Sequence, residues 1–149
     1  MPIPPPPAQV QEAPAPFRGL YGWGYVGPEG EGQGTLAVLV EPATGKVVME
    51  LHGLGERLVL LTGDAASGYR VQVPRQQLDA TAPTLGGLPL PFLPQVPSAE
   101  ALLALLKEGK GPGVRVTKQG PSGPLKLHYR GQDAKGREEQ VWLTWKPVP

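Results

Sequence analysis

The stretch from Ser98 to Gly109, SAEALLALLKEG, encodes the most convincing helix of this 149-residue chain. Ser98 is a favourable N-cap, because its hydroxyl can accept a hydrogen bond from a free amide of the first turn. Gly109 can adopt the left-handed conformation that closes a helix. Glu100 and Lys107 carry charges that complement the two ends of the helix dipole. The residues between are nearly all apolar, which predicts a helix covered on most sides, for example by the concave face of a sheet.

Segments typical of β-strands surround this helix, six before it and three after it. Short strands joined by hairpin-like turns predict an antiparallel sheet with one apolar and one polar face. The expected strands are Phe17–Val26, Thr35–Val40, Val47–Leu51, Arg57–Thr62, Tyr69–Val73 and an edge segment at 76–82, then Val114–Lys118, Leu125–Arg130 and Glu139–Lys146. Turns are expected over Gly27–Gly34 and at Thr44-Gly45.

The helix is too short for the sheet that it accompanies. About eleven residues span about 16 Å, which cannot cover eight or nine strands, and a long antiparallel meander curls as strands accumulate. The sequence therefore predicts a mainly β fold: a curled antiparallel sheet that forms an incomplete β-barrel with a helical lid or plug. Two alternatives remain open at this stage. The helix lies over an apolar hollow that can take a ligand, or it is an ordinary core helix and loops complete the second layer.

Composition limits the classes of function. The net charge is +1, which gives no argument for a nucleic-acid partner, and no run of about 18 apolar residues predicts a membrane-spanning helix. Cysteine is absent, which removes disulfides, thiolate metal sites and cysteine nucleophiles. The length suits one domain, which we expect at 17–149. Residues 1–16 include four consecutive prolines, Pro4–Pro7, and predict an extended, Pro-rich disordered tether.

The tether bears on the cellular compartment. No charged segment followed by an apolar segment indicates a signal peptide in this sequence. A Pro-rich arm is nevertheless typical of exported lipoproteins, which hang from such a linker after their modified cysteine. We therefore expect a protein of the periplasm or outer membrane that is lipid-anchored in its full-length precursor.

Motifs that would indicate catalysis or cofactor binding are weak. Gly22–Gly27 matches the dinucleotide pattern G-x-G-x-x-G, but no helix follows to receive a phosphate, so these glycines are expected to relieve crowding or mark bulges. His52 and His128 lie on separate strands and are expected at the surface. The pair Glu138-Glu139 is expected to be solvated. We predict no catalytic residue, no metal, no cofactor and no enzymatic activity.

Three tryptophans fall on the first and last strands. Because these strands approach each other in a curled sheet, Trp23, Trp142 and Trp145 could seal the barrel gap or stack on a ligand. For at least one of the three, simple packing in the core is expected instead. Trp142 and Trp145 are three residues apart and point to opposite faces of a strand, so one of them lies outside or at a rim. An exposed tryptophan suits contact with a membrane interface.

Several passages together resemble a known bacterial family. They are Met49–Asp64 (MELHGLGERLVLLTGD), Leu85–Pro91 with the Leu-rich helix and Gly109, and the closing strands Leu127–Arg130 and Val141–Trp145. Over residues 17–146 the chain resembles the LolA/LolB family of lipoprotein carriers and receptors, the outer-membrane receptor LolB most of all. The resemblance implies an incomplete barrel with a helical lid, an apolar cavity for acyl chains and no enzymatic activity. It also implies a loop residue that contacts the membrane, and Leu54 holds that position.

The expected function follows from these observations. We expect a non-enzymatic envelope lipoprotein that binds acyl chains, lipids or lipoproteins and acts in lipoprotein localisation. Its expected partners are the inner leaflet of the outer membrane and a periplasmic carrier protein, and the chain is expected to be a monomer. The helix and the loop at 92–94 would move aside for the chain. The expected cavity residues are Leu36, Val38, Val47, Met49, Leu51, Val59, Leu61, Val71, Leu102, Leu105, Leu106 and Leu127.

The alternative is a structural or scaffold lipoprotein of the envelope without lipid cargo. Its helix would fill the core, and a protein partner would add to a sheet edge.

Overall fold

The computed structural model describes residues 15–53, 55–133 and 135–146. The predicted tether therefore lies almost wholly outside the described residues, as does Leu54. The described strands are β1 (Phe17–Gly27), β2 (Gly30–Glu41), β3 (Lys46–Gly53), β4 (Glu56–Asp64), β5 (Gly68–Val73), β6 (Leu78–Ala82), β7 (Val114–Gly120), β8 (Gly123–Gln132) and β9 (Glu138–Trp145). One α-helix, α1 (Ala99–Glu108), lies between β6 and β7, with short 3-10 turns at Pro74–Gln76 and Leu85–Gly87.

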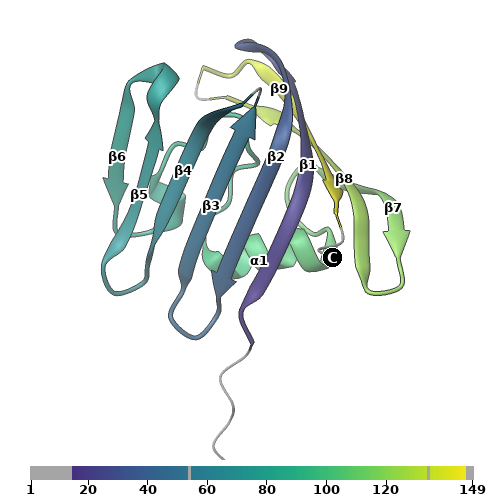
Figure 1. The fold of residues 1–149 in the computed structure, drawn as a ribbon, viewed down its shortest axis with the longest axis horizontal. Helices are drawn as coiled ribbons and strands as arrows, with labels where there is room; N and C mark the ends of the chain where they lie inside the picture. The colour runs from purple at the N-terminus through teal and green to yellow at the C-terminus, as the bar shows by residue number, and fades with distance from the viewer. Residues whose placement is uncertain (1–14, 54, 134, 147–149) are drawn as a thin grey trace, which may run out of the picture.

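All nine strands belong to one antiparallel sheet, in the order β6-β5-β4-β3-β2-β1-β9-β8-β7. Figure 1 shows the sheet curling around helix α1. The edge strands β6 and β7 do not pair with each other, so the barrel stays open. The predicted mainly β fold, a curled sheet that forms an incomplete barrel around one helix, is confirmed.

Alternation along each strand separates an inner face, on the side of α1, from an outer face. In β3 the buried side chains are Val47, Met49 and Leu51, whereas Glu50 and His52 lie on the outer face. Such period-2 burial is what a sheet covered on one face requires. The inner face therefore carries the apolar core.

The first and last strands are neighbours at the centre of the sheet. β1 pairs with β9 from Tyr21↔Trp145 to Val26↔Gln140, and with β2 on its other side. The expectation that the tryptophans seal the barrel gap is wrong, because the gap lies between β6 and β7. Trp23 lies buried in the core on the inner face, which confirms the expectation that at least one of the three tryptophans packs in the core.

The first turn is shorter than predicted. Pro28 and Glu29 alone connect β1 to β2, and Gly30 already pairs with Gly27. Backbone hydrogen bonds hold this hairpin, so its glycines continue the ladder although they add no side-chain packing. A Cβ on Gly27 would collide with the hydroxyl of Tyr25, two residues away on the same face. A Cβ on Gly22 or Gly24 would meet its nearest neighbours at 3.4 Å and 3.8 Å. The expectation that these glycines relieve crowding is therefore confirmed at Gly27 only.

Both ends of helix α1 form as its sequence predicts. The Ser98 hydroxyl accepts a hydrogen bond from the Ala101 backbone N–H at 3.1 Å, and Gly109 closes the helix in the left-handed conformation, with φ 69°. The prediction that the helix is covered on most sides is wrong, because the sheet covers one face only. Its buried residues are Ala99, Leu102, Leu105 and Leu106, while Ala101, Leu103 and Ala104 are half-buried.

A long connection completes the second layer. Residues 83–113, which we call the strap, link β6 to β7 and thus cross the inner face from one edge of the sheet to the other. The strap contains α1. Ahead of the helix it buries Leu85, Leu88, Leu90, Leu93 and Val96, each no more than 5% exposed. The loop layer left open as an alternative by the sequence is therefore present.

Candidate ligand-binding site beneath the strap

The twelve residues predicted to line an acyl cavity lie together in one core. All are buried, and all belong to a single apolar cluster between the inner face of the sheet and the strap. Their binding role stays a prediction, but their convergence gives the candidate site its position.

Little empty space remains inside this core. A hollow of about 10 Å³ lies beneath the strap, enough for about one water molecule. Six of the predicted residues line it: Leu36, Val38, Met49, Leu102, Leu105 and Leu106. Leu93, Pro94 and Val96 of the strap close it from the other side. The larger hollow expected from the short helix is absent here, because the strap fills the area that the helix alone could not cover.

Apolar contacts are the main attachment of the strap to the sheet. Among the described residues, the hydrogen bond between its central part and the strands comes from an aromatic side chain: the Trp23 indole N–H donates to the Phe92 carbonyl oxygen at 2.9 Å. Sliding or lifting of the strap therefore breaks few polar contacts.

Phe92 is the strained point of the strap. Its φ of 68° is left-handed, a conformation that is unusual for a bulky residue and costs about 1–3 kcal/mol. Its ring packs edge-on against Tyr25, with centroids 5.2 Å apart, and against Trp23. These contacts and the indole hydrogen bond hold the strained conformation in place. The strained backbone and the contacts that attach the strap to the sheet thus both occur at Phe92, in the loop at 92–94 that the sequence analysis expects to move.

A groove opens to the surface at the end of the helix. Its volume is about 190 Å³, and Leu106 lines both this groove and the interior hollow. Apolar side chains of β1, β8 and β9, including Tyr21 and Trp145, form its walls, together with the cations Arg18 and Lys107. An apolar slot with cations in its lining suits a hydrocarbon chain with an anionic end.

A polar pocket of about 410 Å³ lies at the opposite end of β1. Glu139 lines it and is only 4% exposed, so the expectation that Glu139 is solvated is wrong. The Tyr25 hydroxyl donates a hydrogen bond to Glu139 Oε2 at 3.3 Å. Burial raises the pKa of Glu139, and the nearby Asp133 carboxylate raises it further.

The sequence carried a signal for Glu139 that the prediction missed. Glu139 has the same parity in β9 as Val141 and Leu143, which are both buried. An acidic residue at an inward position breaks the binary pattern of its strand, and such breaks are expected at functional sites.

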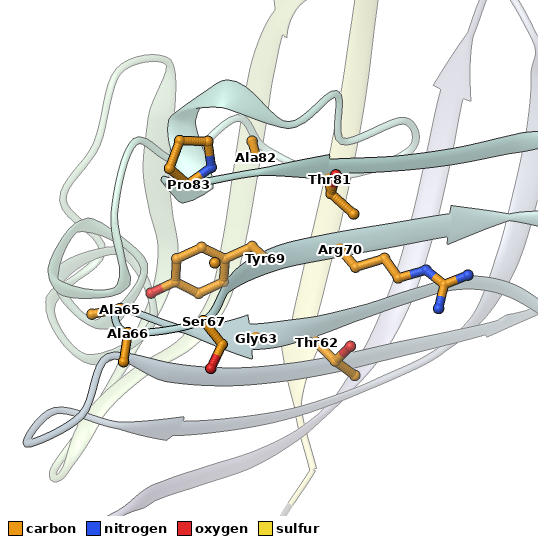
Figure 2. A pocket seen from close by; sticks show the side chains of 11 residues that line it. Thr62, Gly63, Ala65, Ala66, Ser67, Tyr69, Arg70, Thr81, Ala82 and Pro83 are labelled. Carbon is orange, nitrogen blue, oxygen red and sulfur yellow. The ribbon is translucent and has the colours of Figure 1, made fainter.

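A third depression, shown in Figure 2, lies over β4, β5 and β6. Its volume is about 560 Å³, and small side chains such as Ala65, Ala66 and Ser67 surround it. The Tyr69 hydroxyl donates to the Gly45 carbonyl oxygen at 2.6 Å, and Arg70 pairs with Asp79. Because these polar groups already have partners, the depression offers little chemistry for a ligand.

The remaining predicted residues lie on the outer face or at a rim. His128 stacks on Trp142 with ring centroids 4.9 Å apart, and its Nε2 lies 2.8 Å from Gln140 Oε1. Trp142 and Trp145 are 38% and 39% exposed, the first on the outer face and the second at the groove. Within the described ranges, no group of three or more His, Asp or Glu side chains could hold a metal ion.

No helix among the described residues is long and apolar enough to cross a membrane. Comparison of the chain with protein-family models, with curated proteins and with solved structures finds no match.

Proposed function

We propose that this chain is a non-enzymatic lipid-binding module of the bacterial cell envelope, of the kind found in the LolA/LolB family. In this proposal it binds an acyl chain, of a lipid or of a lipoprotein, between the strap and the inner face of the sheet. Its Pro-rich arm tethers it at the outer membrane, where it acts in lipoprotein localisation together with a periplasmic carrier.

The apolar packing of the strap against the sheet is the observation that carries the proposal. Leu90, Leu93 and Val96 of the strap are buried against the sheet, which is worth about 2 kcal/mol for each side chain. About eight methylenes of an acyl chain, at about 0.8 kcal/mol each, offset that loss. Release of the left-handed Phe92 favours the exchange further. An ordinary membrane acyl chain is therefore long enough to compete with the strap for the same apolar surface.

The groove beside Leu106 supports an entry route. It is open to solvent, it shares Leu106 with the interior, and it contains Arg18 and Lys107. A chain that enters here would lie against the apolar walls of the groove and against Leu106, while its anionic end would stay near the two cations.

Enlarging the hollow is expected to strengthen binding while it weakens the fold. Leu93→Ala removes a fully buried side chain from the hollow and is expected to cost about 2–5 kcal/mol of stability. The vacated space should admit a chain more easily, so a dansyl-labelled undecanoic acid is expected to bind about tenfold more tightly. Fluorescence titration and thermal unfolding measure the two effects.

The matched control is Leu103→Ala, which truncates a half-buried leucine of the same strap, on helix α1 and away from the hollow. This variant should leave the affinity for the probe unchanged. If the unmodified protein, Leu93→Ala and Leu103→Ala bound the probe equally tightly, the acyl chain would have to bind outside the hollow.

A native mass spectrum of protein purified without detergent adds a second test. Extra mass in the lipid range supports cargo, whereas a clean apoprotein that ignores the probe supports the scaffold alternative.

Membrane delivery is tested at Leu54, which lies outside the described residues. We expect Leu54→Glu to reduce binding to vesicles of anionic phospholipid at least threefold, since a charge is costly in the membrane interface. The melting temperature should stay nearly unchanged. Co-sedimentation with vesicles measures binding. A large drop in melting temperature would mean that Leu54 packs in the core.

A further inference from the structure

We infer that the polar pocket above Glu139 is a binding site for an organic ammonium group, with the Glu139 carboxylate as its counter-ion. The inference goes beyond the proposed function, because neither the pocket nor its chemistry requires an acyl chain. The ammonium can belong to a free alkylamine or to the head group of an aminophospholipid. Both sources share the chemistry that the pocket would recognise.

The first observation is a buried carboxylate with little compensation. Glu139 is 4% exposed, and its hydrogen bond among the described residues is the one from Tyr25, at the long distance of 3.3 Å. No cationic side chain of the described residues lies within 4.0 Å of it. A buried charge is costly unless a partner compensates it. A ligand cation in the pocket would supply that partner.

The second observation is that the nearby cation already has partners. Arg137 Nε lies 2.9 Å from Asp133 Oδ2, and an Arg137 amino group lies 3.6 Å from Glu29 Oε1. Arg137 is thereby held by two other carboxylates of the same pocket. Glu29, Asp133 and Glu139 together outnumber Arg137 and Lys135 in its lining, which leaves a net negative site.

The third observation is the aromatic wall. Tyr25 and Phe92 line the pocket and pack edge-to-face, and Trp23 stacks on Tyr25 with ring centroids 6.1 Å apart. Aromatic rings attract organic cations, and a carboxylate beside them adds charge pairing. The volume of about 410 Å³ lies within the range of small-ligand sites. Carboxylate, rings and volume together favour an ammonium over an inorganic ion.

The test is an NMR titration of the full chain with butylammonium chloride at pH 7. Its short alkyl group needs no movement of the strap, so the result does not depend on the acyl site. The indole N–H signal of Trp23 reports binding, because it is hydrogen-bonded to Phe92 in the pocket wall. We expect a saturable shift with a dissociation constant of about 1 mM, and none with butyrate or butanol.

Two variants on neighbouring residues make the test specific. Glu139→Gln is expected to weaken butylammonium binding at least tenfold. Glu138→Gln, which removes an exposed carboxylate paired with Arg130, should leave it within twofold. No saturable shift, or an equal affinity in Glu139→Gln, would overturn the inference. The fatty-acid probe reports the proposed acyl site separately, so the two proposals can fail independently.

Lysophosphatidylethanolamine and lysophosphatidylglycerol of equal chain length identify the source of the ammonium. A preference for the ethanolamine head group that Glu139→Gln abolishes assigns the site to a lipid. Equal binding of both lipids, with butylammonium still bound, assigns it to a free amine. If neither lipid preference nor butylammonium binding depends on Glu139, the site is not an ammonium site.

Stability against pH gives an independent readout of the uncompensated charge. Tyr25 and Tyr129 face Glu139 from the strands, and Glu29, Asp133, Lys135 and Arg137 belong to the adjacent turns. Burial raises the pKa of Glu139 above its value in the unfolded chain. The protonated side chain therefore contributes fully to the folding stability below the ordinary glutamate pKa, and this contribution is lost as pH rises through the folded-state pKa. We therefore expect Glu139→Gln to melt about 3 °C above the unmodified chain at pH 7 and level with it near pH 4. Saturating butylammonium should remove the difference in melting temperature between the unmodified chain and Glu139→Gln at pH 7. A difference that persists would contradict charge pairing between Glu139 and the ammonium.

Discussion

Leu61→Ala is expected to lower the free energy of unfolding by about 3–4 kcal/mol, or about 12 °C in melting temperature. Leu61 is fully buried on the inner face of β4, between Met49 of β3 and Val71 of β5. Truncation removes its apolar contacts and leaves a cavity that a close-packed sheet layer cannot collapse. Chemical denaturation followed by tryptophan fluorescence measures the loss.

The adjacent residue provides the control. Leu60 points to the outer face, where it is half-buried between Glu50 and Gln72. Leu60→Ala should cost no more than about 1 kcal/mol, since surface substitutions rarely cost more. Similar losses for the two variants would contradict the assignment of inner and outer faces to β4.

Gly34→Ala is expected to be the most damaging substitution of a single small residue, with a loss of at least about 3 kcal/mol. A Cβ at Gly34 would collide with the His52 carbonyl oxygen and would lie 2.9 Å from the Gly53 Cα. Both are backbone atoms of β3, so no side-chain rotation can relieve the overlap. Thermal unfolding, or soluble yield if folding fails, measures the effect.

Gly24→Ala tests whether steric overlap is the cause. Its Cβ would meet side-chain atoms of Trp142, the nearest at the ordinary distance of 3.8 Å. Alanine is favoured over glycine within a strand by about 0.5 kcal/mol, so a small gain in stability is expected. If Gly34→Ala melted as high as Gly24→Ala, the close approach of β2 and β3 would be disproved.

The residues of the candidate site that lie on strands were predictable, because apolar and polar residues alternate along each strand and the apolar ones share the inner face. Residues such as Val47, Met49 and Leu51 alternate with polar neighbours, and their shared face follows directly from the period of a strand. The strap was harder to anticipate. Leu85, Leu88, Leu90 and Leu93 form no strand or helix period, because proline and glycine interrupt the segment. Their burial is decided by the sheet beneath them.

For Glu139, two signals in the sequence contradict each other. Its parity with Val141 predicts an inward side chain, whereas its charge predicts solvent. Tertiary structure resolves the conflict, because the pairing of β1 with β9 brings Tyr25 beside Glu139 at the start of β9, where the β8–β9 turn lines the 410 Å³ pocket. Neither could be located without knowing that β1 pairs with β9.

The sequence by itself determined the local structure of this protein: the helix with its Ser98 and Gly109 caps, the number of strands and their apolar face. Each depends on neighbours within a few residues, and hydrogen-bond geometry and side-chain period act at that range. Only the tertiary structure decided the pairing of β1 with β9, the path of the strap and the filling of the interior. These depend on contacts between residues far apart in the chain, such as Trp23 with Phe92 and Tyr25 with Glu139. Local pattern contains no information about which distant surfaces meet.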